Sequence, residues 1–168
     1  MLHRFKDKYP KLQKNTFVVE SAQVIGDVEI GEQSSLWFNV VVRGDVNFIR
    51  IGARTNIQDG SVIHVTHEQH PTCIGDDVTI GHNVTLHGCK IGNRCLVGMG
   101  ATVMDGTIVA DDALIAAGAL VTPGTHVASG TLYAGCPAKY VRHLSENEIE
   151  SLKQSAQNYL RYVEAYQI

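Results

Sequence analysis

Residues 74–103 read Ile74-Gly-Asp-Asp-Val-Thr-Ile80-Gly-His-Asn-Val-Thr-Leu86-His-Gly-Cys-Lys-Ile91-Gly-Asn-Arg-Cys-Leu-Val97-Gly-Met-Gly-Ala-Thr-Val103. An aliphatic residue recurs about every six positions, which is neither the 3.6-residue period of a helix nor simple strand alternation. Three aliphatic columns repeat at an interval of 17 residues: Ile74, Ile91 and Ile108; Ile80, Val97 and Leu114; and Leu86, Val103 and Leu120. This repetition predicts an all-β solenoid, a parallel β-helix whose coils each hold three short strands around an aliphatic core.

Upstream of this stretch the repeat is less regular. The six-residue spacing holds for Val24, Ile30 and Leu36 and again for Ile51, Ile57 and Ile63. The stretch Val40–Phe48 follows it only loosely. The interval from Ile63 to Ile74 holds six residues more than a coil needs. We expect the extra length to form a loop, His64–Cys73, that projects at a corner. Pro71 supports this loop because proline lacks the donor that a strand ladder requires.

Length and composition are typical of one domain without a nucleic-acid or membrane partner. The chain has 168 residues, a net charge of −3 and a pI near 6.2, so it offers no basic surface for nucleic acid or anionic lipid. The start, Met1–Lys8, is not followed by an apolar stretch typical of a secretory signal, and no run is long enough to span a bilayer. The four cysteines form no C-x-x-C pair, which favours a cytoplasmic protein without a disulfide framework.

The character of the chain changes after the repeats. Pro137 ends the repeat region, and Ser145 with Glu148 forms a capping box that starts a helix. One apolar stripe follows: Ile149, Leu152, Ala156, Leu160 and Val163. We therefore divide the chain into an N-terminal segment (1–17), a β-helix that we expect to bind a metal (18–143) and a C-terminal helix (144–168).

Three histidines have informative places on the repeat. His64 and His87 directly follow the third column in successive coils, and their separation in the chain equals one coil plus the six-residue insertion. Neighbouring strands lie ~4.8 Å apart, so both imidazoles can reach one cation at ~2.1 Å. His82 follows the second column, on a different face, and would reach that cation only from a neighbouring chain. This predicts a trimer with three shared sites, suited to Zn²⁺ or another divalent metal.

A simpler interpretation treats these histidines as surface residues, because the chain has eight histidines and some coincidence of spacing is expected. Stacking in matched positions argues against coincidence for His64 and His87. His64, His67 and His70 also have ligand-like intervals. These three histidines share one loop. We interpret it as a polar surface loop from which only His64 binds the metal.

Several motifs together resemble the gamma-class carbonic anhydrase-like family of hexapeptide-repeat proteins. They are Val41-Val-Arg-Gly-Asp45, Thr55-Asn-Ile-Gln-Asp-Gly60, Ile80-Gly-His82, Leu86-His-Gly-Cys89 and Leu96-Val-Gly-Met-Gly100. The resemblance covers about residues 18–143. It implies a left-handed β-helix, a homotrimer and a metal held at subunit interfaces by His64, His82 and His87. It also implies reversible hydration of CO2 to bicarbonate by a metal-bound hydroxide, with Zn²⁺ as the metal and Fe²⁺ or Co²⁺ as alternatives.

The resemblance assigns roles to further residues. Arg43 and Asp45 match a charged pair that ties subunits together near the site, and the simpler interpretation is a purely structural ion pair at the interface. Gln58 matches the glutamine that orients the hydroxide, and Asp59 is the adjacent acid of the same motif. Two further polar residues match positions near the site: Asn56, which supports the turn or the substrate, and Tyr133, which lines the site or simply packs in its turn.

The chain also departs from the family. In well-known active members one glutamate follows the RGD motif and another lies on an acidic loop, and both move protons to solvent. Val46 and His67 stand at these positions, with Glu68 beside the latter. His67 is a candidate replacement shuttle, because an unperturbed histidine titrates near pH ~6.5. Two alternatives stay open: an acyl-CoA-dependent hexapeptide acyltransferase, and a metal-binding scaffold protein without catalysis.

Overall fold

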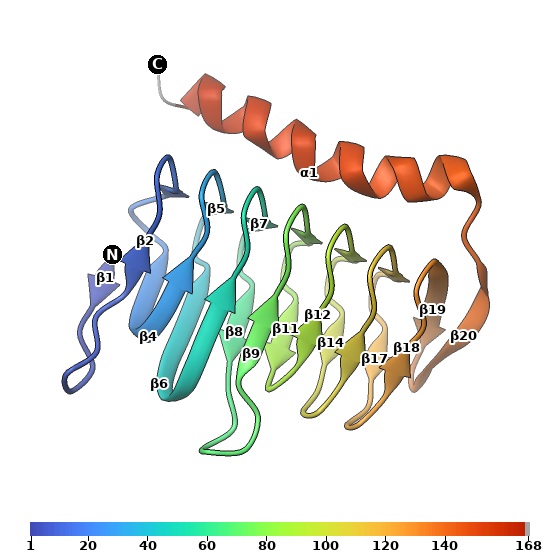
Figure 1. Cartoon of the computed structure of the whole chain (residues 1–168), viewed down its shortest axis with the longest axis horizontal. Coiled ribbons are helices and arrows are strands. Elements are labelled where there is room, and N and C mark those ends of the chain that lie inside the picture. The colour runs from blue at the N-terminus through green and yellow to red at the C-terminus, as the bar shows by residue number, and fades with distance from the viewer. Residues whose placement is uncertain (167–168) are drawn as a thin grey trace.

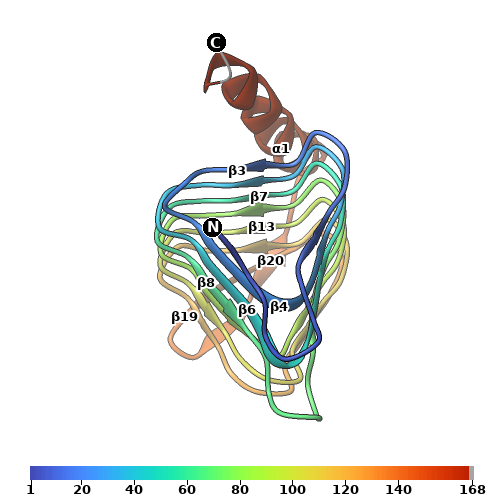
Figure 2. The same ribbon diagram turned by 90° about the vertical axis from the view of Figure 1, so that its left-hand side faces the viewer.

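A computed structural model describes residues 1–166 as a parallel β-solenoid with one C-terminal helix. Short strands stack coil upon coil along the solenoid axis (Figure 1), and the coils are roughly triangular in cross-section (Figure 2). The fold therefore matches the β-solenoid that the six-residue periodicity predicts.

Two sheets form the three faces of the solenoid. The first holds β1 (Leu2–His3), β2 (Lys11–Leu12), β4 (Gln23–Ile30), β6 (Val41–Ile51), β8 (Val62–His64), β9 (Thr72–Ile74), β11 (Thr85–His87), β12 (Lys90–Ile91), β14 (Thr102–Val103), β15 (Ile108–Val109), β17 (Leu120–Val121) and β18 (His126–Val127). The second holds β3 (Phe17–Val18), β5 (Ser35–Leu36), β7 (Asn56–Ile57), β10 (Thr79–Ile80), β13 (Leu96–Val97), β16 (Leu114–Ile115), β19 (Thr131–Gly135) and β20 (Ala138–His143).

The long strands β4 and β6 turn a corner and so join two faces into the first sheet. Val42 of β6 pairs with Ile63 on one side of this corner, and Ile51 pairs with Ile74 on the other. The loosely repeating stretch Val40–Phe48 thus falls largely within β6. The segment 65–71 projects as a loop from the same corner, between β8 and β9 (Figure 1), as the extra length between Ile63 and Ile74 predicts. The loop is shorter than the predicted His64–Cys73, because the two ends of that segment belong to β8 and β9.

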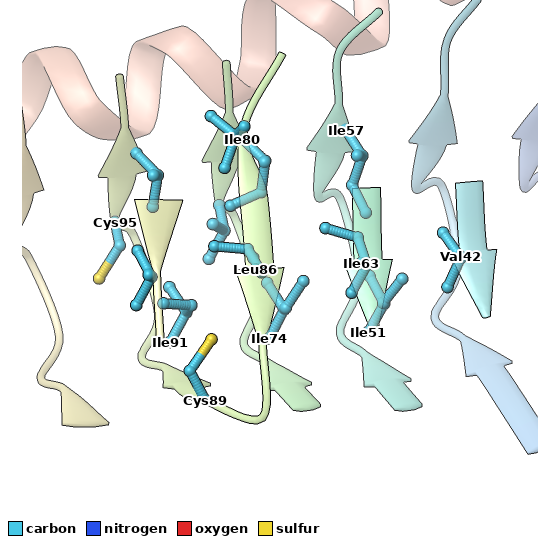
Figure 3. Packing of buried hydrophobic residues seen from close by; sticks show 14 of the residues in the cluster. Val42, Ile51, Ile57, Ile63, Ile74, Ile80, Leu86, Cys89, Ile91 and Cys95 are labelled. Atoms are coloured by element: carbon cyan, nitrogen blue, oxygen red, sulfur yellow. The ribbon is translucent and has the colours of Figure 1, made fainter. Parts of the chain in front are cut away.

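Aliphatic side chains from all three faces fill the interior. Ile57, Ile63, Ile80 and Leu86 are completely buried and stack on their counterparts in the next coil (Figure 3). Burying such a side chain stabilises the fold by roughly 1.5–3 kcal/mol. The stack is therefore the main source of stability for strands of only two or three residues.

The predicted columns are wrong by one residue beyond Val103. Ile108 is 42% exposed, and Leu114 and Leu120 are only partly buried. The interior positions belong to the following residue in each case: Val109, Ile115 and Val121.

Coil length explains the error. Ile91 pairs with Ile74 in the preceding coil and with Val109 in the following one, and the second interval is one residue longer than the first. The coil through His87 is the shorter of the two, because its corner from Leu86 to Ile91 spans five positions, against six from Val103 to Val109. Adjacent aliphatic pairs such as Ile108-Val109 satisfy either spacing, so the pattern alone did not reveal the shift.

Helix α1 (Glu146–Tyr166) starts at the last coil and runs back along the second sheet toward the first coils (Figure 1). Its capping box is present: the Glu148 amide donates to Ser145 Oγ, and the Ser145 amide donates to the Glu148 carboxylate. Leu152 and Ala156 are buried, whereas the rest of the predicted stripe is only partly buried. Tyr159 packs edge-on against Trp37, with ring centroids 5.4 Å apart. Residues 167–168 of the predicted helical segment lie outside the described residues.

Two further expectations concern cysteines and membranes. All four cysteines are free. Burial raises the pKa of the Cys89 and Cys95 thiols to about 12, so both are inert core residues. Within residues 1–166, the single helix is not apolar enough to cross a bilayer.

Candidate metal centre

His64 and His87 lie side by side on one face of the solenoid. β8 and β11 pair in parallel, with Ile63 opposite Leu86 and His64 opposite His87. Because successive strand residues point to opposite sides, burial of the two aliphatic residues turns both imidazoles outward. Their ring centroids are 5.1 Å apart, and His64 Nδ1 lies 3.1 Å from His87 Nε2.

Each imidazole has a carboxylate on its other nitrogen. His64 Nε2 lies 3.0 Å from Asp45 Oδ1, and His87 Nδ1 lies 2.8 Å from Asp105 Oδ1. Burial raises the pKa of both carboxyl groups, but hydrogen bonds outweigh this effect and hold each pKa below its usual value. Asp45 accepts these hydrogen bonds from His64 and Arg43, and Asp105 accepts them from Thr66 and His87. Both carboxylates are therefore ionised near neutral pH and can only accept hydrogen bonds.

These acceptors determine the tautomers. His64 must carry its proton on Nε2 and His87 on Nδ1, because each donates to a carboxylate. In the neutral rings, the nitrogens that face each other at 3.1 Å consequently both carry lone pairs. Two lone pairs repel at this distance unless a cation lies between or beside them. Two ligand nitrogens on one tetrahedral Zn²⁺ are about 3.4 Å apart, so this donor pair fits a divalent metal.

His82 lies on another face. It follows β10 in the second sheet, its side chain is 39% exposed, and its Nδ1 lies 2.7 Å from Asp59 Oδ2. That contact leaves Nε2 with the lone pair. Within residues 1–166 of this single chain, no three histidine, cysteine, aspartate or glutamate side chains are grouped to hold a metal. The chain thus brings together two of the three predicted ligands and places the third elsewhere.

A mostly apolar groove of about 460 Å³ adjoins His82 on the second sheet. Gln58 lines this groove, and a series of hydrogen bonds fixes its side chain. Gln58 Nε2 donates to Asn56 Oδ1 at 3.1 Å, Asn56 Nδ2 donates to Thr79 Oγ1 at 3.0 Å, and the Thr79 hydroxyl lies 3.1 Å from Ser155 Oγ on helix α1. Gln58 and Asn56 are both buried, so the glutamine amide has a fixed orientation beside His82.

Other predicted residues surround the histidine pair or lie apart from it. Arg43 forms an ion pair with Asp45 of its own chain, so it also supports the carboxylate that orients His64. His67 is at the loop tip with its side chain 69% exposed, 4.0 Å from Glu68. Val46 is 37% exposed, and its carbonyl accepts a hydrogen bond from the Glu68 amide at 3.4 Å.

Tyr133 lies well away from the histidines of its own chain. It pairs with Ile115 in the last coils, and its hydroxyl donates to the His126 carbonyl at 3.3 Å. Three strand spacings, about 14 Å, separate it along the sheet from Ile80, the strand residue nearest to His82. A role for Tyr133 at the centre would require the site of another chain.

The sequence interpretation missed Asp105 and Thr66. The Thr66 hydroxyl donates to Asp105 Oδ1, the oxygen that also faces His87 Nδ1. The available signal was that Asp105 follows Val103 by two positions, at the corner one coil beyond His87-Gly88. Its neighbours became apparent only once the register of the coils was known.

Comparisons with known families and proteins agree with the fold. Residues 88–123 match the bacterial transferase hexapeptide family (six repeats), and residues 71–104 match the hexapeptide repeat of succinyl-transferase. Two solved structures superpose over 98% of the chain: a hexapeptide transferase family protein from Anaplasma phagocytophilum (43% identity, TM-score 0.94, 97% of that chain) and a putative acetyltransferase from Bacillus cereus (38%, 0.95, 95%). The N-acyltransferase AntD of Bacillus cereus, at 12% identity and a TM-score of 0.73, covering 88% of this chain and 90% of its own, shares the fold alone.

Curated relatives identify the family. Protein YrdA of Escherichia coli is 47% identical over 99% of this chain and 94% of its own length. Gamma carbonic anhydrase 1, a mitochondrial protein of Arabidopsis thaliana, is 47% identical over 95% of this chain and 60% of its own. The probable carbonic anhydrase of Methanocaldococcus jannaschii is 49% identical over 91% and 96%. The chain belongs to the gamma-class carbonic anhydrase-like family of hexapeptide-repeat proteins.

Proposed function

We propose that this protein is a metal-dependent carbonic anhydrase-like enzyme that interconverts CO2 and bicarbonate. The observation that carries the proposal is the pair of facing lone pairs on His64 and His87, held by Asp45 and Asp105. Such a pair is suited to bind a cation, and five of the relatives that match over most of the chain are named carbonic anhydrases.

The third ligand in this proposal is His82 of a neighbouring copy. His82 is outward-facing enough to be shared, and its Nε2 carries the free lone pair because Asp59 occupies Nδ1. Since His82 is on a different face from His64 and His87, closed rotation of three copies would give each subunit one complete set. In a homotrimer with three interfacial sites, every subunit contributes the same ligands, so the three sites are equivalent.

The donor set favours zinc. Three neutral imidazoles with an open position are typical of catalytic Zn²⁺, and imidazole ligands also suit Fe²⁺ and Co²⁺. We propose Zn²⁺ as the resident metal, with the other two as alternatives for the loading experiment. The four free cysteines favour a reducing compartment, and we propose the cytoplasm as the location.

The chemistry divides among the chain's own residues. A bound divalent metal would supply the Lewis acidity that makes water a nucleophile at neutral pH. Gln58 would orient that nucleophile: its side-chain Nε2 donates to Asn56, and no partner in residues 1–166 donates to its side-chain Oε1. His67 accepts the released proton on its exposed imidazole and passes it to solvent, replacing the glutamates absent at Val46 and at its own position. Tyr133 would line the site only from another chain.

Metal content tests the proposal. The purified protein should hold one metal per chain and migrate as a trimer, and His82→Ala should lose the metal while His126→Ala, an exposed histidine at the far end, retains it. Stopped-flow CO2 hydration, on zinc-loaded protein in air and on iron-loaded protein without oxygen, should show catalysis that His82→Ala abolishes. A monomer, or full metal retention in His82→Ala, would contradict the shared site.

Acyl transfer is the second candidate, because the structurally similar Bacillus cereus protein is described as a putative acetyltransferase. The apolar groove beside Gln58 and His82 is a surface that an acyl-CoA could occupy. Chelation separates the two functions: an acyltransferase keeps its activity without metal, whereas CO2 hydration is lost. Metal binding with neither activity would instead identify a scaffold protein.

A further inference from the structure

Asp105 connects a candidate ligand to the projecting loop. It lies at the corner after β14, one coil beyond His87. Its Oδ1 lies 2.8 Å from His87 Nδ1 and also accepts a hydrogen bond from the Thr66 hydroxyl. Thr66 opens the loop and pairs with His70 across it. One carboxylate oxygen therefore restrains both the imidazole and the base of the loop.

Other acidic or amide side chains at the corners accept hydrogen bonds from backbone amides. Asp76 Oδ1 accepts the Ala53 amide at 2.8 Å, Asn93 Oδ1 accepts the Asp76 amide at 2.9 Å, and Asp111 Oδ1 accepts the Asn93 amide at 2.8 Å. Each satisfies a backbone donor of the preceding coil. Within residues 1–166, no backbone amide donates to the Asp105 side-chain carboxylate. Its contacts are side-chain contacts at the histidine pair, so a merely structural role at the corner does not explain them.

Gly88 leaves the space that Asp105 occupies. A Cβ built on Gly88 would overlap Asp105 Oδ1, and the backbone at Gly88 has a positive φ of 56°. Glycine adopts this conformation at little cost. The shortened corner directly after His87 thus brings the carboxylate of the next coil against the histidine ring.

We propose that Asp105 is a positioning residue that fixes the tautomer of His87 for metal binding. This inference rests on the proposed metal site. Without Asp105, His87 is free to carry its proton on Nε2 and to donate it to His64 Nδ1, 3.1 Å away. That hydrogen bond would consume both lone pairs that the metal needs. Partners of this kind typically contribute 10–100-fold to metal affinity, and Asp45 and Asp59 stand in the same relation to His64 and His82.

The tautomer is measurable without metal. Long-range ¹⁵N–¹H NMR on the metal-free protein should show His87 protonated at Nδ1 in the wild type and at Nε2 in Asp105→Ala. Asp105→Asn, which keeps an acceptor oxygen, should retain more of the Nδ1 form. The control is Asp112→Asn, which removes a carboxylate at the next corner, where its partner is Arg94 at 2.6 Å and where asparagine tolerates the left-handed backbone. An unchanged His87 tautomer in Asp105→Ala would overturn the proposal.

Zinc competition with a chromophoric chelator gives the second readout. Asp105→Ala should bind zinc about 10–100-fold more weakly than wild type, Asp105→Asn should be intermediate, and Asp112→Asn should be unchanged. Equal affinity in Asp105→Ala and wild type would refute the positioning role while leaving the metal site intact. A wild-type protein that binds no zinc would refute the proposed function, and the NMR comparison would then still decide the role of Asp105 at His87. If Asp105→Ala fails to fold, Asp105→Asn and Thr66→Val carry both measurements.

Discussion

Asp59 Oδ2 lies 2.7 Å from His82 Nδ1, on a different face from the pair formed by His64 and His87. A site that needs both faces can be rebuilt from two defective chains. We expect His82→Ala and His87→Ala homotrimers each to lack metal. Mixed trimers formed by refolding the two together should recover part of the zinc, because some interfaces then pair an intact His82 with an intact His64 and His87.

Zinc per chain and CO2 hydration in the mixed sample measure this recovery. The control is a mixture of His64→Ala with His87→Ala, which damages the same face in both chains and so should recover no site. Equal metal in the two mixtures would contradict a site shared between faces.

The coil register makes a prediction about stability. Ile115 is completely buried, whereas Ile108, in the same coil, is 42% exposed. Ile115→Ala should lower the free energy of unfolding by about 2–5 kcal/mol, as for large-to-small core changes. Ile108→Ala deletes the same atoms but leaves little cavity, so its cost should stay near the ~0.5 kcal/mol typical of surface positions. Urea unfolding of both variants checks this, and a larger cost at Ile108 would restore the uncorrected register.

Helix α1 should depend on Glu148 in a pH-dependent way. Hydrogen bonds from Arg142 and Ser145 lower the pKa of the Glu148 carboxyl to about 2. A lowered pKa in the folded state means that the stabilisation is complete above the unfolded value, ~4.3, and is lost as the pH falls toward about 2. Glu148→Gln should therefore be less stable than wild type at pH 7. The difference in urea midpoint should shrink below pH ~4.3, and a constant difference from pH 7 to pH 3 would contradict this assignment.

His67 provides the test of proton transfer. If the exposed imidazole carries protons to solvent, His67→Ala should lower the maximal CO2 hydration rate in weak buffer, and added imidazole buffer should restore it. The exchange of CO2 with bicarbonate at equilibrium, which needs no proton transfer to buffer, should remain unchanged. Glu68→Gln, which alters the neighbouring exposed side chain, is the matched control. Identical buffer dependence in His67→Ala and wild type would remove His67 from the mechanism.

The sequence predicted the fold because its information is local and repeated. Hexad spacing places Ile57, Ile63 and Leu86 in the core, and the same count places His87 opposite His64. The count failed where neighbouring aliphatic residues offer two registers, as at Ile108-Val109. The role of Asp105 was not predicted, because it depends on which residue of the preceding coil lies beside the Asp105 side chain. That contact depends on a corner one residue shorter than the corresponding corner of the following coil.

The parallel pairing of β8 with β11 makes the spacing of His64 and His87 independent of the tip of the projecting loop. His64 and His87 are separated in the chain by the projecting loop and by strands β9 and β10, yet hydrogen bonding between adjacent strands determines the distance between their backbones. The loop can therefore gain, lose or exchange proton-carrying side chains while the ligands stay in place. Under the proposed function, a protein built this way can keep its metal through large changes in catalytic rate, so evolution can adjust turnover without rebuilding the site.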